Sequence, residues 1–431
     1  MNYLEMYRRK VVSIEEALME IKSGQEVACG LIACEPVTML SQLHTIADRV
    51  ENVSVLTALL MNEYDFFMKP EMKDHFLLNT WFYTGGARKA HQYGTVSYVP
   101  LELHRSISSR TANRQPDVFL GCACPMDKHG YLSLSASTVY EKDLVERAGK
   151  VIIEVNPNFP RTHGDSHIHI SQVDHIIETD RALPTIPEAV LSDKERLVGH
   201  YVAELIEDES TLQIGFGNIP FAVAGCLTGK KDLGVHTEMF SDGLLDLIEA
   251  GVITNRKKTI WKDKFVMDCA IGTKRLFDFF DNNLAVEFQR GSVVNDPHII
   301  GRNHKMVAIN SALQIDLTGQ CCAESIGSRL YSGTGGHKEF AQGVQSSPGG
   351  KSIIAFPSTA RDDSISQIVP TLDPGAVVTT SRVDVDFVVT EYGIACLRGR
   401  SIRERVTELI NIAHPDFRDY LRSEAERYQI W

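Results

Sequence analysis

One glutamate, Glu238, stands between two glycine-rich segments, and this arrangement indicates acyl chemistry. The upstream segment, residues 214–220, has the sequence IGFGNIP, and the downstream segment, residues 332–337, has the sequence SGTGGH. A glycine turn leaves backbone N–H groups uncovered, and such groups can bind a carboxylate or an oxyanion that develops on an acyl carbon. The pattern therefore favours a nucleophilic carboxylate between two anion-binding loops, although a tight turn without a ligand is the commoner use of glycine.

The upstream segment also shares features with a dinucleotide-binding fingerprint. Gly215 and Gly217 follow an apolar run, and Glu238 lies 21 residues after Gly217, near where that fold keeps its ribose-binding acid. Pro220 occupies the position of the third glycine, which the fingerprint needs for close packing of helix on strand. The sequence therefore disfavours a nicotinamide-dependent dehydrogenase without excluding it.

Two further polar residues lie in or after apolar runs that predict strands. Asn310 interrupts one such run, and its amide could donate to an oxyanion or be a satisfied interior group. Glu391 follows the predicted strand 387–390, and catalytic residues often occupy the carboxyl ends of strands. A solvent-facing loop acid is the alternative for Glu391. For Glu238 the alternative is an acid near the N-terminus of a helix at 244–250, where the helix dipole favours a negative charge.

Composition sets the class of protein. The 431 residues are 43% hydrophobic, which predicts a globular protein of two domains. The formal charge of −12 disfavours nucleic acid as a partner. No apolar run approaches the ~18 residues of a membrane span, and the N-terminus lacks an apolar targeting segment. The nine cysteines are odd in number and lack C-x-x-C spacing, so we expect a cytoplasmic protein without disulfides or zinc, with Cys321 and Cys322 buried.

A repeated strand, loop and helix pattern positions these residues. It occurs first at residues 26–46 and again from residue 211, an offset of about 185 residues, which predicts a duplicated pair of α/β domains with parallel sheets. Two prolines at 184 and 187 mark a linker, so we expect one domain over residues 1–188 and a second over 189–431. Other predictions are helices capped by Ser13 and Ser192, the first over residues 14–23, and a helix over 37–46. A structural role is expected for His129, and solvated turns at 230–231 and 255–258.

Taken together, these motifs resemble those of the acetyl-CoA hydrolase/transferase family, and the resemblance runs nearly end to end. The segments that carry it are 215–220, 236–243 (HTEMFSDG), 332–336, 379–382 (TTSR) and 389–395 (VTEYGIA). The resemblance implies an α/β fold of two similar CoA-transferase-type domains with the active site at their interface. It implies that Glu238 is the nucleophile, that the Asn310 amide stabilises an oxyanion, and that Glu391 is a second active-site acid. It also implies loops that bind the substrate or CoA, formed by Gly215, Gly217, Asn218, Gly335 and Gly336.

The resemblance also implies an activity. The expected reaction passes CoA between acetyl-CoA and 4-hydroxybutyrate by a ping-pong route through a glutamyl-CoA thioester. Butyrate or another short-chain acid as acceptor, an acetyl-CoA hydrolase, and a non-catalytic CoA-binding module are the alternatives. The expected partners are acyl-CoA and short-chain carboxylate substrates and a second copy in a homodimer. No metal and no permanently bound cofactor are expected.

Overall fold

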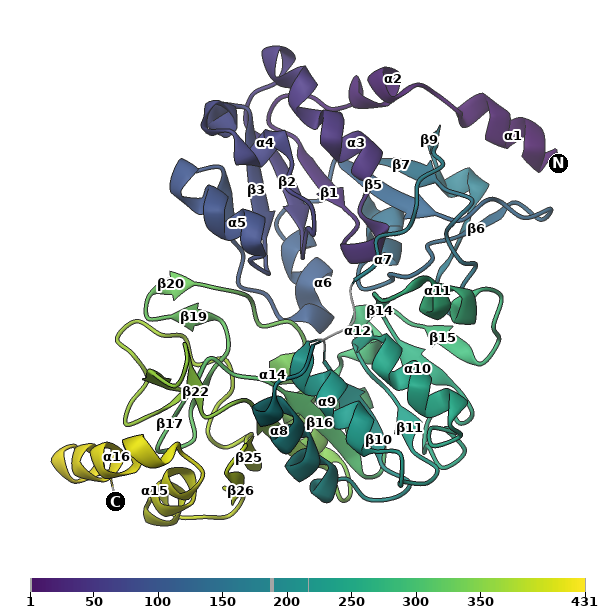
Figure 1. Cartoon of the computed structure of the whole chain (residues 1–431). Helices are drawn as coiled ribbons and strands as arrows, with labels where there is room; N and C mark the ends of the chain where they lie inside the picture. The colour runs from purple at the N-terminus through teal and green to yellow at the C-terminus, as the bar shows by residue number, and fades with distance from the viewer. Residues whose placement is uncertain (1, 187–189, 216, 431) are drawn as a thin grey trace. The chain divides into compact units, whose positions relative to one another are not determined.

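The computed structural model describes residues 2–186, 190–215 and 217–430. The chain divides into two compact units, one of Met1–Ile186 with Val266–Val293 and the other of Pro187–Phe265 with Val294–Trp431 (Figure 1). Residues 266–293 thus belong to the first unit although they follow the start of the second. The predicted domain boundary at 188/189 and Phe216 of the upstream glycine motif lie outside the described residues.

The first unit is built on a parallel sheet with the strand order β4-β3-β2-β1-β5-β7-β9. Its strands are β1 (Glu26–Cys29), β2 (Val53–Thr57), β3 (Phe76–Thr80), β4 (Val96–Tyr98), β5 (Val118–Ala123), β7 (Lys150–Val155) and β9 (His175–Glu178). Every residue of β1 and β5 is buried. Burial on both faces explains why β5, and β1 after Glu26, are continuous apolar runs rather than alternating ones.

The second unit repeats this topology. Its sheet has the order β11-β10-β16-β21-β25-β26, parallel except for the antiparallel last strand. The strands are β10 (Thr211–Ile214), β11 (Gly234–Val235), β16 (Met306–Asn310), β21 (Lys351–Ala355), β25 (Phe387–Thr390) and β26 (Gly393–Cys396). In chain order, β10, β11, β16, β21 and β25 occupy the same places as β1, β2, β5, β7 and β9 of the first unit. The shared order supports the predicted duplication.

Helices connect the strands in both units. In the first unit they are α1 (Tyr3–Lys10), α2 (Ile14–Leu18), α3 (Val37–Gln42), α4 (Asp65–Met68), α5 (Gly85–Ala90), α6 (Ser106–Thr111), α7 (Glu141–Arg147) and α11 (Lys274–Phe280). In the second unit they are α8 (Asp193–Leu205), α9 (Asn218–Cys226), α10 (Asp242–Glu249), α13 (Pro297–Ile300), α14 (His337–Gly343), α15 (Ile402–Asn411) and α16 (Pro415–Arg427), while α12 (Gly291–Val294) crosses the division between the units.

The predicted helix starts are confirmed, whereas two predicted ends are wrong. Ser13 and Ser192 each form a capping box, with Glu16 and Glu195 respectively. The helix after Ser13 ends at Leu18 rather than at residue 23, because the chain leaves the helix to bury Ile21 completely. The helix predicted over 37–46 ends at Gln42 and continues as a 3-10 helix over Leu43–Arg49.

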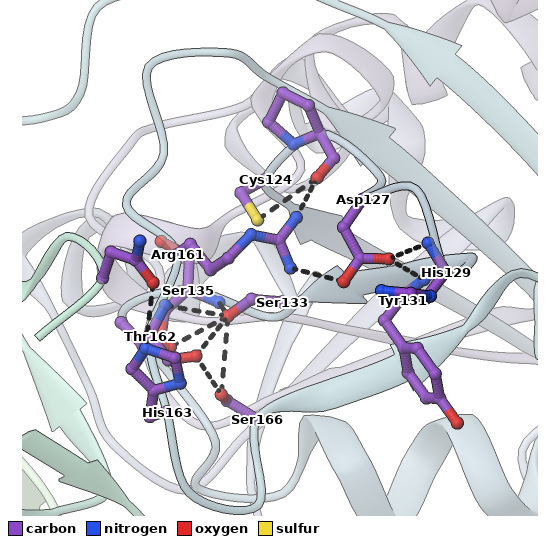
Figure 2. A network of polar contacts seen from close by, with 12 residues as sticks. Cys124, Asp127, His129, Tyr131, Ser133, Ser135, Arg161, Thr162, His163 and Ser166 are labelled. Atoms are coloured by element: carbon purple, nitrogen blue, oxygen red, sulfur yellow. Dashed lines mark hydrogen bonds and ion pairs between the residues drawn. The ribbon is translucent and has the colours of Figure 1, made fainter. Parts of the chain in front are cut away.

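A polar turn in the first unit explains the structural role predicted for His129. The Asp127 carboxylate accepts hydrogen bonds from the backbone N–H groups of His129 (2.8 Å) and Tyr131 (2.9 Å). Figure 2 shows the Arg161 guanidinium reaching the other oxygen of Asp127, at 3.9 Å. Beside it, the buried hydroxyls of Ser133 and Thr162 lie 2.9 Å apart. The residues near His129 therefore fix a loop.

Candidate functional site

The predicted site residues of the second unit follow the strands of one sheet. Gly215 follows β10, Glu238 lies three residues after β11, Asn310 is the last residue of β16, and Glu391 directly follows β25. These four strands are mutually parallel, so their carboxyl ends meet at one edge of the sheet. Ligands of α/β proteins bind at this edge.

The segment that carries Glu238 is held tightly to the sheet. The Thr237 hydroxyl, buried, donates to the Ile214 carbonyl at the end of β10 (3.2 Å). The side-chain oxygen of Asn255 accepts a hydrogen bond from the backbone N–H of Val235 (2.8 Å), on the strand that leads into this segment. Because both attachments involve buried groups, the backbone before Glu238 has little freedom to move.

The solvated turn predicted over residues 255–258 is wrong for two of its four residues. Lys258 is 4% exposed and Asn255 is fully buried. The Lys258 ammonium donates to the carbonyls of Val235 (2.7 Å) and Lys264 (2.8 Å). A lysine can be buried when its charge is matched by hydrogen-bond acceptors, and here one of the two acceptors, the Val235 carbonyl, belongs to the edge strand β11. The buried Lys258 side chain therefore stabilises the strand that precedes Glu238.

The structure brings the downstream glycine loop against the Glu238 carboxylate. A Cβ atom added at Gly336 would lie 2.0 Å from Oε2 of Glu238, and one added at Gly335 would lie 3.6 Å from Oε1. Gly335 also has φ +51, a backbone conformation that favours glycine. Gly336 donates its backbone N–H to the carboxylate. Glycine is needed at 336 because a side chain there would occupy the space of the carboxylate oxygen, and at 335 because of its backbone conformation.

Two further residues act on Glu238. The Asn295 amide nitrogen, on a fully buried side chain, donates to Oε2 of Glu238 at 3.3 Å. Burial, followed by the like charge of Glu339, raises the pKa of Glu238 to about 7, and the Gly336 and Asn295 hydrogen bonds oppose this rise. A carboxylate with a pKa near neutrality is more basic than an ordinary one and remains partly ionised at pH 7. Both properties suit a nucleophile.

Asn310 is paired with a neighbouring amide. Its side chain exchanges hydrogen bonds with Gln213 of β10, over 3.4 Å and 3.5 Å. Both residues lie on adjacent parallel strands, where Gln213 pairs in register with Ala308. The two amides form one polar patch at the carboxyl end of the sheet. The oxyanion role of Asn310 remains a prediction.

Glu391 lies in a different environment from Glu238. It is 8% exposed, and its two oxygens accept from the backbone N–H (2.7 Å) and the hydroxyl (2.8 Å) of Ser358. The Lys194 ammonium is 3.7 Å from Oε1 and also bonds Thr359 (3.1 Å) and Asp363. This acid is therefore neutralised and fixed by its neighbours. Its role in catalysis remains a prediction.

The upstream glycine turn supports helix α9. Gly217 is the residue before the helix and has φ +122, which side chains rarely adopt. Among the described residues outside its immediate chain neighbours, none lies within 4 Å of a Cβ atom added at Gly217. The Asn218 side chain donates to Glu195 near the start of α8 (2.8 Å), which ties the two helices together. Substrate binding by Gly215, Gly217 and Asn218 remains a prediction.

Asn295 and Glu339 could not be recognised as site residues from local sequence patterns. Asn295 precedes Asp296 and Pro297, which form the cap and first residue of α13, so the local pattern indicates a helix start rather than an active-site amide. Glu339, 1% exposed, lies in the first turn of α14, three residues after Gly336. Residues three apart share a helix face, so its relevance follows once Gly336 is placed beside Glu238.

The described residues include no group of three or more His, Cys, Asp or Glu side chains that could hold a metal ion. Within the same residues, no helix is long and apolar enough to cross a membrane. The nine cysteines are free thiols, and Cys321 and Cys322 are buried as predicted. Burial raises the pKa of the Cys321 thiol, which makes it a poor nucleophile.

Comparison with known proteins gives matches over nearly the whole chain. Residues 1–187 match the model of the acetyl-CoA hydrolase/transferase N-terminal domain, and residues 272–425 match that of the C-terminal domain. A 4-hydroxybutyrate coenzyme A transferase of Clostridium kluyveri is 43% identical over 99% of this chain and 100% of its own length. A succinyl-CoA:cyclohexane-1-carboxylate CoA transferase of Geobacter metallireducens is also 43% identical, over 99% and 97%.

Among solved structures, a 4-hydroxybutyrate CoA-transferase of Porphyromonas gingivalis is similar to the chain, with a TM-score of 0.85 and 37% identity. The alignment covers 99% of this chain and 100% of the other. The similarity therefore includes both units and the segments that surround Glu238.

Proposed function

The chain belongs to the acetyl-CoA hydrolase/transferase family, and on that premise we propose that it transfers CoA between acetyl-CoA and 4-hydroxybutyrate through a thioester on Glu238. One observation carries the proposal. The Glu238 carboxylate, with its pKa raised to about 7, lies against Gly336 and within hydrogen-bonding distance of the Asn295 amide. A basic carboxylate beside two N–H donors can act first as a nucleophile and then as an electrophilic acyl carbon.

The first half-reaction moves CoA to the enzyme. One Glu238 oxygen attacks the acetyl-CoA carbonyl carbon, and the C–S bond breaks to give a mixed anhydride and CoA thiolate. The thiolate then attacks Cδ of Glu238, and the bond from Cδ to the bridging oxygen breaks to release acetate. During this attack the remaining carboxyl oxygen carries the negative charge, and the Asn295 amide, 3.3 Å from Oε2, and the Gly336 N–H can donate to it.

The second half-reaction reverses these steps with the acceptor acid. The 4-hydroxybutyrate carboxylate attacks Cδ, CoA thiolate leaves, and the resulting anhydride is cleaved by the thiolate at the acceptor's carbonyl carbon. The Glu238 carboxylate is restored, and one thioester has replaced another, so the overall exchange needs no ATP. Because acetate leaves before the acceptor enters, we expect ping-pong kinetics.

Borohydride trapping tests the covalent step. Protein incubated with acetyl-CoA and then reduced should carry the alcohol derived from a thioester at Glu238, detected in the peptide that contains residues 234–243. Glu238→Gln, which keeps the side-chain size, is the matched control and should not be reduced. An unmodified wild-type peptide, under conditions in which CoA is exchanged, would rule out the glutamyl thioester.

The acceptor acid is the second part of the proposal. The two relatives at 43% identity are named for 4-hydroxybutyrate and for cyclohexane-1-carboxylate, so both acids, and butyrate, should be compared as acceptors. We expect 4-hydroxybutyrate to have the highest kcat/KM. A higher value for one of the other acids would reassign the substrate and leave the mechanism intact.

Release of CoA without an acceptor separates a transferase from a hydrolase. We expect consumption of acetyl-CoA beyond one equivalent per site to depend on added acceptor acid and to yield the CoA ester of that acid, without net release of free CoA. Steady release with water alone would identify an acetyl-CoA hydrolase. We also propose a cytoplasmic homodimer that takes CoA esters as substrates and has no permanently bound cofactor. Sedimentation of the purified protein would test the dimer.

A further inference from the structure

His236 lies two residues before Glu238, and its ring connects three segments that surround the carboxylate. Its Nε2 atom is 2.8 Å from the Val294 carbonyl oxygen, and Val294 immediately precedes Asn295. The chain segments 236–238 and 294–295 are therefore joined twice, once by His236 with Val294 and once by Asn295 with Glu238.

The same ring contacts the helix that follows the glycine loop. The His236 and Phe340 rings meet edge to face with centroids 6.2 Å apart, and Phe340 lies on α14, four residues after Gly336. On another side, the Trp261 ring lies 5.8 Å away. Trp261 has φ +46, a costly conformation for an aromatic residue. A strained residue persists where its surroundings fix it, here beside His236.

The hydrogen bond defines the state of the imidazole. A carbonyl oxygen can accept but not donate, so Nε2 carries the proton that faces Val294. Nδ1 is buried and has no hydrogen-bond partner among the described residues. Burial, and then the positive charge of Lys258, lower the pKa of His236 to about 3. The ring is therefore neutral, and its donor is present throughout the pH range in which Glu238 titrates.

We propose that His236 is a positioning residue for the nucleophile, and that its hydrogen bond to Val294 sets the separation between the Glu238 carboxylate and the Asn295 amide. The inference rests on the proposed function of Glu238. Without this bond, the segment that carries Asn295 would lose its attachment to the strand end that carries Glu238. A displacement of about 1 Å at a reacting group can lower a rate by about a hundredfold.

The test compares His236→Phe with His236→Gln in the full-length protein. Phenylalanine keeps a ring beside Trp261 and Phe340 but has no N–H donor, whereas the glutamine amide can reach the same carbonyl. We expect H236F to lower kcat by about ten- to a hundredfold with little change in the KM for acetyl-CoA. H236Q should recover most of this loss. His75→Phe is the matched control, because His75 Nδ1 also lies 2.8 Å from a backbone carbonyl, that of Val50 in the other unit.

The pH profile distinguishes positioning from a general loss of stability. The Asn295 hydrogen bond lowers the pKa of Glu238, so weakening it in H236F should move the acidic limb of kcat/KM to higher pH. A merely destabilised enzyme would keep the wild-type limb. An H236F enzyme that matches H75F in rate, or that loses rate with an unshifted limb, would overturn the inference.

A second readout covers the case in which H236F does not fold. H236Q alone should then retain kcat within about fivefold and keep the wild-type acidic limb, and a loss of about a hundredfold would overturn the inference. Failure of the proposed function would be seen separately, because wild-type protein would then not trap a thioester at Glu238. Wild-type trapping with normal H236F turnover would reject only the role of His236.

Discussion

Glu238 and Glu391 follow parallel strands of the same sheet, but the structure treats their charges in opposite ways. Glu391 accepts both Ser358 donors and lies 3.7 Å from the Lys194 ammonium. Glu238 lies near the like charge of Glu339, and its pKa is raised to about 7. Burial and a like charge disfavour an ionised carboxylate, and both act on Glu238. Position at a strand end is therefore common to both acids, and reactivity is decided by their neighbours.

The two acids are also far apart across the sheet. Glu238 follows β11 and Glu391 follows β25, which are four strand spacings apart in the order β11-β10-β16-β21-β25. At roughly 4.8 Å for each spacing, the two strands lie about 19 Å apart. We therefore expect the two carboxylates to act at different places rather than on the same carbonyl carbon. We expect Glu238 to perform the chemistry and Glu391 to fix the loops around Ser358.

Removal of each carboxylate is the strongest test of this difference. Glu238→Gln should lower kcat by roughly 10⁴-fold or more, because the amide cannot attack the thioester. Glu391→Gln, the matched variant, should lower it by less than about tenfold, since the amide keeps the side-chain size and one acceptor. Steady-state CoA exchange measures both. Equal losses in the two variants would show that the acids act together and would break the comparison.

The glycine beside Glu238 provides the next largest effect. Gly336→Ala would place Cβ 2.0 Å from Oε2, so the carboxylate must move away from its N–H donor. We expect kcat to fall by on the order of 10²–10³-fold, the range for losing one oxyanion donor. Gly225→Ala in α9, where nothing lies within 4 Å of the added atom, is the control. A G336A enzyme as active as G225A would contradict the placement of the loop.

The dependence of rate on pH reports the environment of Glu238 directly. A raised pKa means that the carboxylate is protonated, and unable to attack, below about pH 7. We therefore expect kcat/KM to fall about tenfold per pH unit below this value and to level off above it. A profile between about pH 5 and about pH 9 tests this expectation. An acidic limb near the ordinary glutamate value of about 4.3 would show that Glu238 is not perturbed.

Sequence patterns predicted strands such as β1 and β16 because burial on both faces leaves continuous apolar runs, as in residues 27–29 of β1 and 306–309 of β16. The glycines at 335 and 336 were also informative, since few other structures use such a cluster. The burial of Lys258 and the hydrogen bond of Asn295 to Glu238 could not be predicted from local patterns of this kind. The burial of a lysine and the partner of an amide depend on residues about 20 and 60 positions away, such as Val235 and Glu238.

The difference between the two strand-end acids also depends on residues that are distant in sequence. The motif around Glu391 is as distinctive as that around Glu238, yet the contacts that neutralise Glu391 come from Ser358 and Lys194, which are distant in sequence. Strand ends could be located from the sequence. Whether an acid there is satisfied or left costly to ionise is a property of tertiary contacts, so it required the structure.

The smallest expected effect concerns stability at the Glu391 end of the sheet. Ser358→Ala removes the hydroxyl that donates to Glu391 at 2.8 Å and leaves the backbone N–H bond of 2.7 Å in place. A buried hydrogen bond to a charged group contributes about 1.5–3 kcal/mol, and in this variant the Lys194 ammonium still lies beside the Glu391 carboxylate. We therefore expect the free energy of unfolding to fall by about 1–2 kcal/mol, with kcat nearly unchanged. Denaturant unfolding measures the free energy of unfolding, and CoA exchange measures kcat.

The control for this prediction is Ser364→Ala, at an exposed turn where the Ser364 hydroxyl donates to the Arg361 carbonyl. A large loss of kcat in S358A at wild-type stability would place Glu391 in the chemistry after all.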